Sequence, residues 1–302
     1  MFSELLQHSG LSFDRLQSFC LVAEAGGVTN AAKGDPAKQS LYSRQIRDLE
    51  EFFGVELMRR GGRGITLTEA GANLHRISRE HFAALSDFKS ECKEQPVEVV
   101  IGAGDSIIQW LLLPRLAEIR KSLPRMRLKF LNLTTDDAVK RLADGLIDFA
   151  VVREDAIARP LQSAPLGVMG YSLFMPQSLK SAPGKKSDVK LLDNLPLATL
   201  EGGGSFRGAL AEIAKKQKFK VNIQIECSSF PLAARAVCKG DVAAILPTIA
   251  APELQSIAAI EVRLGFLRHF DRKMCLASNP RSVRIRPLLQ KIGTALAHLC
   301  QF

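Results

Sequence analysis

Histidine and cysteine have the greatest capacity for metal binding or nucleophilic chemistry in this chain, and their spacing supports neither. The histidines and cysteines are scattered without the short separations of a zinc site, a disulfide frame or a catalytic triad. We therefore expect reduced, mostly buried thiols, no metal site and no cofactor. The residues are His8, His75, His81, His269, His298, Cys20, Cys92, Cys227, Cys238, Cys275 and Cys300.

A serine hydrolase is the alternative enzyme class. Ser205 follows three glycines and precedes Phe206, which is not the Gly-x-Ser-x-Gly arrangement of an activated nucleophile. The sequence therefore predicts no catalytic residue and a protein that is not an enzyme.

A polar arc on one predicted helix is suited to reading DNA. Asp35 is placed to cap a helix that has Pro36 as its first residue and ends near Phe53. Tyr42, Ile46, Leu49 and Phe53 form an apolar stripe on it. The opposite arc carries short amides and hydroxyls first and arginines one turn later, as a helix in a major groove requires; a solvated helix face is the alternative. The arc comprises Gln39, Ser40, Ser43, Arg44 and Arg47.

Two helices and a hairpin should position this third helix. Residues 14–25 have helical apolar periodicity and end at Gly26-Gly27, and Thr29 is placed to cap a short second helix that carries Ala31 and Ala32. Two extended runs then flank a basic, glycine-rich tip at residues 59–64. This pattern predicts a β-hairpin wing, with Arg60 and Arg63 near phosphates or a minor groove, or else a flexible loop.

Across about 60 residues, this region resembles the DNA-binding domain of LysR-type transcriptional regulators. The matching residues are Ala31-Ala32, Gln39, Ser43-Arg44-Gln45-Ile46, Leu49-Glu50, Phe53-Gly54-Val55-Glu56-Leu57 and Leu67-Thr68-Glu69-Ala70-Gly71. The chain departs from the family at Asp35, where a leucine is usual, and at Lys38, where a serine is usual. These changes put the family's usual operator preference in question. The alternative is a LysR-like protein with degenerate DNA contacts that acts mainly by ligand binding or hetero-oligomerisation.

The next segment should be a connecting helix. Thr66 and Glu69 have capping-box spacing. Apolar residues then recur in steps of four and three, which suits pairing with a second copy or packing against the chain's own domains. The stripe is Ala70, Leu74, Ile77, His81, Ala84 and Phe88. In LysR-type regulators this helix dimerises, so the resemblance implies a homodimer or homotetramer.

Charge is unevenly distributed along the 302 residues. Residues 1–95 hold 12 Lys and Arg against 13 Asp and Glu, so the remaining 29 basic and 18 acidic residues give residues 96–302 the whole positive excess of this +10 chain. That excess favours an anionic effector such as a carboxylate, or equally serves solubility or non-specific attraction to DNA. Neither a signal sequence nor a membrane-length apolar run is found, so we expect a cytosolic protein rather than a secreted solute-binding protein.

Residues 96–302 alternate short apolar strands with helices, which predicts two α/β lobes with parallel sheets and a cleft between them. The expected helices include one over about 107–122 and a last one over about 285–299, and the expected strands lie near 97–101, 127–133, 149–152, 197–200, 221–226 and 242–246. Loops after the strands bring amides and hydroxyls to helix starts near Ser106, near Thr134-Thr135 and near Gly204-Ser205. More loosely than the first, this half resembles the LysR effector domain, which is similar in fold to periplasmic solute-binding proteins. The resemblance implies a small-molecule effector. The candidate contacts are Ser106, Ile107, Thr134, Thr135, Gly204, Ser205 and Phe206.

The sequence thus predicts an α/β chain with an N-terminal winged helix-turn-helix. The expected parts are a DNA-binding domain over 1–68, a linker helix and hinge over 69–95, and an effector domain over 96–302. Within the last, lobe I covers about 96–168 and 270–302, and lobe II about 169–269. The expected partners are double-stranded DNA, a small-molecule effector and further copies of the chain, but no membrane. The candidate DNA contacts are Thr29, Lys38, Gln39, Ser40, Ser43, Arg44, Arg47, Arg60 and Arg63.

Overall fold

The structure is a computed structural model, and it describes residues 10–61, 64–179, 191–203, 205–256 and 259–302. The chain divides into two compact units, one of residues 1–95 with 144–146 and one of the remaining residues.

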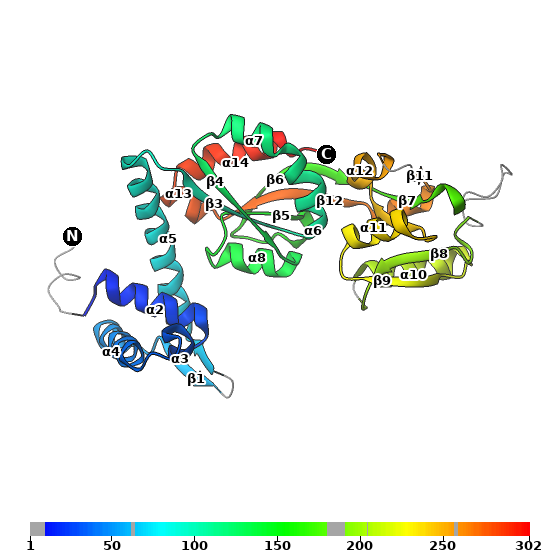
Figure 1. Cartoon of the computed structure of the whole chain (residues 1–302). Coiled ribbons are helices and arrows are strands. Elements are labelled where there is room, and N and C mark those ends of the chain that lie inside the picture. The colour runs from blue at the N-terminus through cyan, green and yellow to red at the C-terminus, as the bar shows by residue number, and fades with distance from the viewer. Residues whose placement is uncertain (1–9, 62–63, 180–190, 204, 257–258) are drawn as a thin grey trace. The chain divides into compact units, whose positions relative to one another are not determined.

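The first unit is a helical domain with a two-stranded wing and a long following helix (Figure 1). Its elements are α2 (Phe13–Ala25), α3 (Val28–Ala32), α4 (Pro36–Phe53), β1 (Met58–Gly61), β2 (Gly64–Leu67) and α5 (Glu69–Cys92). One core joins them, made by buried Phe19 and Val22 of α2, Ile46 and Leu49 of α4, and Leu57 before β1. These are the apolar positions that recur at helical spacing in the sequence.

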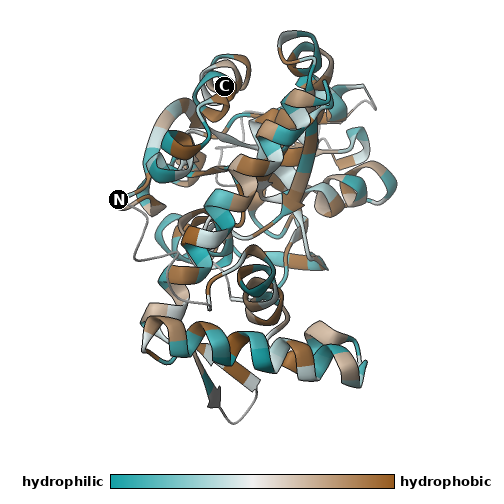
Figure 2. Cartoon of the chain, turned by 90° about the vertical axis from the view of Figure 1, so that its left-hand side faces the viewer, coloured by the Kyte–Doolittle hydropathy of each residue, from teal (hydrophilic) through white to brown (hydrophobic). Residues whose placement is uncertain are grey.

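Amphipathic helices account for this packing. Figure 2 shows apolar and hydrophilic residues alternating along the helices, so each can bury one side and leave the other in water. The Arg15 guanidinium of α2 lies 2.9 Å from the Asp48 carboxylate of α4 and adds a polar link between the two helices. The order of three helices, wing and long helix confirms the predicted winged helix-turn-helix.

The second unit contains a five-stranded sheet with helices on both faces (Figure 1). Its order is β4-β3-β5-β12-β6, from β3 (Val97–Ala103), β4 (Met126–Asn132), β5 (Phe149–Arg153), β6 (Gln162–Met169) and β12 (Arg272–Ser278). We call this sheet with its helices the first lobe. Apolar residues of α14 (Leu288–Leu299) and α7 (Leu116–Ser122) pack on one face, and those of α8 (Thr135–Ala143) on the other.

Two smaller sheets form the second lobe of this unit. One has the order β10-β7-β11 and the other pairs β8 with β9, and an isolated bridge between Leu197 and Ala243 links them. The strands are β7 (Tyr171–Met175), β8 (Pro196–Leu200), β9 (Asn222–Cys227), β10 (Ala244–Pro247) and β11 (Ile260–Val262). The main helices are α10 (Ser205–Gln217) and α11 (Phe230–Lys239), and each covers its own apolar cluster.

The remaining short elements connect these layers. They are α6 (Asp105–Ile107), η1 (Ile108–Leu112), η2 (Leu113–Arg115), η3 (Glu154–Ala156), η4 (Gln177–Leu179), η5 (Thr248–Ala250), α12 (Ala251–Gln255), η6 (Gly265–Phe270) and α13 (Pro280–Ile285). Arg286, after α13, makes a buried ion pair with Asp148, whose carboxylate also accepts a hydrogen bond from Val100 N of β3 at 2.7 Å. This network fixes the end of α13 to the first sheet.

Three details of the predicted fold are wrong. The sheets are not all parallel: the five-stranded sheet is mixed, because β12 runs antiparallel to both β5 and β6, and the β10-β7-β11 sheet is antiparallel. Only β8 and β9 form a sheet that is parallel throughout. The single helix expected over 107–122 is interrupted at Pro114, and the last helix is split into α13 and α14 at Pro287. Proline removes the N–H that a continuous helix would need at these positions.

Candidate nucleic-acid interface and effector-binding residues

The predicted recognition helix has the bounds that its sequence indicates. The Asp35 side chain caps α4 by accepting hydrogen bonds from Ala37 N at 2.9 Å and Lys38 N at 3.3 Å. Pro36 occupies the first turn, and Gly54 ends the helix in the left-handed region at φ 66°. The unusual Asp35 therefore has a local structural role, and Lys38 Nζ lies 3.9 Å from its carboxylate.

The two sides of α4 separate as predicted. Ile46 is 7% exposed and Leu49 fully buried, whereas Ser40, Ser43, Arg44 and Arg47 are exposed. Gln39 is half-buried, and Lys38 is exposed. The apolar stripe ends earlier than expected, because Phe53 is 37% exposed.

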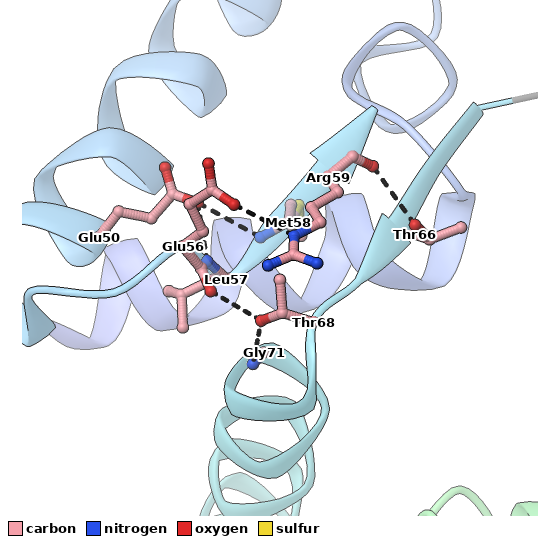
Figure 3. Close-up of polar contacts among 8 residues, drawn as sticks. All are labelled: Glu50, Glu56, Leu57, Met58, Arg59, Thr66, Thr68 and Gly71. Carbon is pink, nitrogen blue, oxygen red and sulfur yellow. Dashed lines mark hydrogen bonds and ion pairs between the residues drawn. The ribbon is translucent and has the colours of Figure 1, made fainter. Parts of the chain in front are cut away.

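The wing is a regular antiparallel hairpin tied to α4 (Figure 3). The Glu50 carboxylate, near the end of α4, accepts hydrogen bonds from Leu57 N at 2.8 Å and Met58 N at 3.3 Å. Ile65 N of β2 donates to the carbonyl of Gly26, in the turn after α2, at 3.1 Å. The wing is thereby held in a fixed position relative to the recognition helix.

The long helix begins two residues later than the capping box suggests. Thr68 caps α5 by accepting a hydrogen bond from Gly71 N at 3.0 Å, and its own hydroxyl donates to Glu56 O at 2.7 Å (Figure 3). Thr66 instead lies in β2 and faces the Arg59 carbonyl at 3.5 Å. The predicted cap at Thr66 is therefore wrong, because the wing extends through Leu67.

A surface hollow of about 500 Å³ brings several predicted DNA contacts together. Thr29 from α3, Gln39 and Ser43 from α4, and Gly64 and Ile65 from β2 line it. Thr29 is exposed inside α3 and does not cap it, since Gly27 holds the cap position. The hollow has the mixed amide and hydroxyl lining that a polar ligand such as a nucleic-acid edge or backbone requires.

Asn30 also lines the hollow but was not predicted. Its side chain donates to Ala25 O at 3.1 Å, and its place beside Thr29 on the short second helix was the available signal. The side chain of Arg60 and the residue Arg63 lie outside the described residues, as do Gly204 and the side chain of Ser205.

The stripe on α5 divides into two parts. Ala70 and Leu74 pack against the core of their own domain, as one of the two alternatives requires. Farther along, His81 is exposed, and Ile77 and Phe88 are 45% and 64% exposed. Beside this part lies a groove of about 570 Å³ between α2 and α5, whose lining includes Phe13, Leu21, Phe82 and Leu85.

A polar cluster at this groove links α2 to α5, and its residues Glu24 and Arg79 are part of the groove lining. Glu24 Oε1 lies 3.5 Å from His75 Nε2 and 2.6 Å from Arg79 Nη1. Interaction with His75, and then with Arg79, holds the pKa of the Glu24 carboxyl below its ordinary value, although partial burial opposes this. Burial raises the pKa of the neighbouring Cys20 thiol to about 12, so this cysteine is a packing residue rather than a nucleophile.

The predicted effector contacts lie at two sheet edges. Half-buried Ser106 and buried Ile107 follow β3, and Thr134 and Thr135 follow the adjacent parallel strand β4, so these residues come together at one edge. Thr134 is engaged locally, since its hydroxyl donates to Asp137 Oδ2 at 2.8 Å. Phe206 belongs to the second lobe, where its ring centroid lies 4.8 Å from that of Phe270 and 5.0 Å from that of Phe230.

Three structural findings concern metal binding, the cysteines and membrane spans. Among the described residues, no group of three or more His, Cys, Asp and Glu side chains is arranged to hold a metal ion. Four cysteines are buried and Cys238 is half-buried, but Cys92 is exposed. In the part of the chain that the structure describes, no helix is both long and apolar enough to cross a membrane.

The fold and these surfaces define a class of protein: a winged helix-turn-helix DNA-binding module joined to a two-lobed α/β sensor domain. The family model described as "Bacterial regulatory helix-turn-helix protein, lysR family" matches residues 13–72, and "LysR substrate binding domain" matches residues 94–298. The chain belongs to the LysR family. It is a LysR-type transcriptional regulator, with a DNA-binding and an effector-binding domain, and its family consists of regulators rather than enzymes.

Individual relatives agree with this assignment. The chain is similar to a probable nitrogen assimilation transcriptional activator of Synechococcus elongatus, at 27% identity over 97% of this chain and 98% of the relative. ArgP from Mycobacterium tuberculosis has a similar fold, with TM-score 0.69 and 17% identity over 96% of this chain and 97% of that chain. Full-length CbnR, solved with its target DNA, has TM-score 0.56 and 20% identity over 92% of this chain and all of that chain.

Proposed function

We propose that this regulator reads its operator through α4 and the wing. The supporting observation is the polar arc of α4, in which Ser40, Ser43, Arg44 and Arg47 are exposed and Gln39 is half-buried. The opposite side of the helix carries buried Ile46 and Leu49. Amides can pair with base edges in a major groove, and arginines can pair with guanine or with phosphate. Thr29, Lys38, Arg60 and Arg63 would add contacts to the backbone. A protein that acts on chromosomal DNA in this way works in the cytoplasm.

Arg44→Ala tests the recognition helix. If Arg44 reads a base, we expect this change to weaken operator binding by about 1–3 kcal/mol. If Arg44 instead contacts a phosphate, binding to all DNA sequences should weaken equally, and the slope of log affinity against log salt concentration should fall by about one. The measurement is fluorescence anisotropy, over a salt series, with DNA from upstream of the regulator's own gene. Arg120→Ala, at an exposed position on α7, is the matched control. Unchanged affinity and salt slope for Arg44→Ala would show that α4 does not read DNA.

If the wild-type chain protects no site on this DNA from cleavage even at low salt, degenerate DNA contacts become the better explanation.

We further propose that the working unit is a dimer. Ile77, Leu85 and Phe88 on α5 are each between 45% and 64% exposed, and Leu85 also lines the groove beside α2. A second copy of the chain would bury these side chains and place two reading heads on one operator. Two dimers could combine into a tetramer.

The effector of this proposal is a small anion bound near Ser106, Ile107 and Thr135. The net positive charge of residues 96–302 supports it, as does the half-buried hydroxyl of Ser106 at the carboxyl end of a parallel strand. Ligand would favour one arrangement of the lobes over another and so change the spacing of the reading heads.

A thermal-shift panel of small carboxylates, with putrescine and agmatine as cationic contrasts that lack a carboxylate, tests this site. We expect at least one carboxylate to raise the melting temperature of the wild-type chain, and Ser106→Ala to lose most of that rise while keeping its basal DNA affinity. Ser122→Ala, at an exposed position at the end of α7, is the control. Stabilisation by the cationic compounds only, or an undiminished rise in Ser106→Ala, contradicts the proposed site.

A further inference from the structure

One contact between the two lobes of the second unit joins a buried indole to an exposed carboxylate. The indole N–H of Trp110, on the first lobe, donates to Glu253 Oε2 of α12, on the second lobe, at 2.8 Å. Gln109 Nε2 lies 3.3 Å from the same oxygen. Trp110 is only 5% exposed, although it is the largest side chain of its segment.

The segment that carries Trp110 divides its side chains between the two lobes. Ile107, Leu111 and Leu112 belong to the core of the first lobe. Trp110 belongs to a core cluster of the second lobe, together with Phe174 of β7. In a regular α-helix, residues 107 and 110 would share a side because they are three positions apart, so that side would have to serve both cores.

A change in helix type explains how Trp110 turns away. Residues Ile108–Leu112 form a π-helical turn, and a 3₁₀ turn with Pro114 follows directly. Pro114 has no N–H to offer the carbonyl of Trp110, so the regular α-helical hydrogen bond cannot form there. The wider turn rotates Trp110 out of the first lobe. Such π-helical turns occur frequently at functional sites.

This segment also carries the proposed effector contacts. Ser106 precedes Trp110 by four residues in continuous helical structure, a rise of about 6 Å. A displacement of Ser106 or Ile107 is therefore transmitted to Trp110. The chain itself crosses between the lobes from β6 to β7 and from η6 to β12. The hydrogen bond between Trp110 and Glu253 adds a non-covalent connection between the lobes.

We propose that Trp110 and Glu253 are positioning residues for the effector response: their contact holds the lobes at one relative angle, and an effector acts on that angle by moving the segment Asp105–Leu112. The inference rests on the proposed effector role of Ser106 and Ile107. It identifies the contact between Trp110 and Glu253 as the one through which effector binding at that site would change the position of the second lobe.

The chain has a single tryptophan, which allows a direct test by fluorine NMR. Full-length protein labelled with 5-fluorotryptophan should give one resonance, and Glu253→Ala should shift it or divide it into two. Amide exchange over Tyr171–Met175 should become about ten-fold faster or more, as expected for losing a hydrogen bond to a charged group. Glu253→Gln keeps an acceptor oxygen and should restore most of the wild-type behaviour. Glu212→Ala, at an exposed position on α10, is the control and should change neither.

Wild-type resonance and exchange in Glu253→Ala would overturn the proposal, whether or not an effector is known. A second arm uses any carboxylate whose stabilisation is lost in Ser106→Ala: it should move the fluorotryptophan resonance of the wild-type chain, and an unmoved resonance would also overturn the proposal. Failure of DNA binding, with both arms as expected, would contradict the proposed operator contacts but leave this contact between the lobes intact.

Discussion

At the scale of single residues, the two departures from the LysR pattern are linked. Asp35 caps the recognition helix with two hydrogen bonds, and Lys38 Nζ lies 3.9 Å from its carboxylate. An aspartate in place of the family's usual leucine gives up an apolar contact but satisfies N–H groups that the start of a helix leaves unpaired. The departure is therefore compatible with an intact recognition helix.

Asp35→Ala should lower the free energy of unfolding by about 1 kcal/mol, within the range of about 0.5–2 kcal/mol for loss of such a cap. Urea denaturation monitored by circular dichroism measures this change. Asp35→Asn retains a capping side chain and should cost less. Equal stability of Asp35→Ala and the wild-type chain would mean that the cap contributes nothing to α4.

Gly71 shows a residue-scale constraint that the sequence pattern alone does not explain. A Cβ at this position would lie 1.9 Å from the carbonyl oxygen of Leu57. The start of α5 therefore packs directly on the backbone before β1, and only glycine permits that approach. With the Thr68 cap, this contact fixes the long helix to the wing.

At the scale of elements, local signals predicted the first unit well. Pro36 and Gly54 delimit α4 because capping and turn chemistry act within a few residues. The strand β6 was missed because it contains Pro165 and Gly167, which are typical of loops, and because its partner β12 lies about a hundred residues farther along the chain. Local pattern carries no information on such a distant pairing.

The exposed part of α5 leads to a prediction about assembly. Phe88 is 64% exposed, and burying a phenylalanine contributes about 1.5–3 kcal/mol. A symmetric dimer contains two copies, so Phe88→Glu should weaken dimerisation by about 3 kcal/mol or more. Sedimentation equilibrium measures the dissociation constant.

Lys89→Glu, at the neighbouring exposed position, is the matched control for charge reversal and should leave dimerisation much less affected. An unchanged dissociation constant in Phe88→Glu would move the interface away from this part of α5. A wild-type chain that is monomeric at all concentrations would remove the dimer from the account.

At the scale of the whole molecule, the sequence predicted the class of protein and its DNA-binding surface more completely than it predicted the effector site. The DNA-binding residues are close together in the chain, so one helix brings Gln39, Ser43 and Arg44 to one surface. The effector contacts come from segments about a hundred residues apart, and the structure groups Ser106 with Thr135 while Phe206 packs among the rings of the second lobe. Trp110 was missed altogether, because its partner Glu253 follows 143 positions later.

The central claim is that the exposed arc of α4 reads base sequence, and selection of bound sites from random DNA tests it most directly. Gln39 lines the hollow between α3, α4 and the wing, and an amide that pairs with adenine discriminates by about 1–3 kcal/mol. The wild-type chain should select a two-fold symmetric sequence, and Gln39→Ala should lose the preference at one position in each half-site while keeping the others. An unchanged selected sequence for Gln39→Ala, Ser43→Ala and Arg44→Ala alike would contradict the claim.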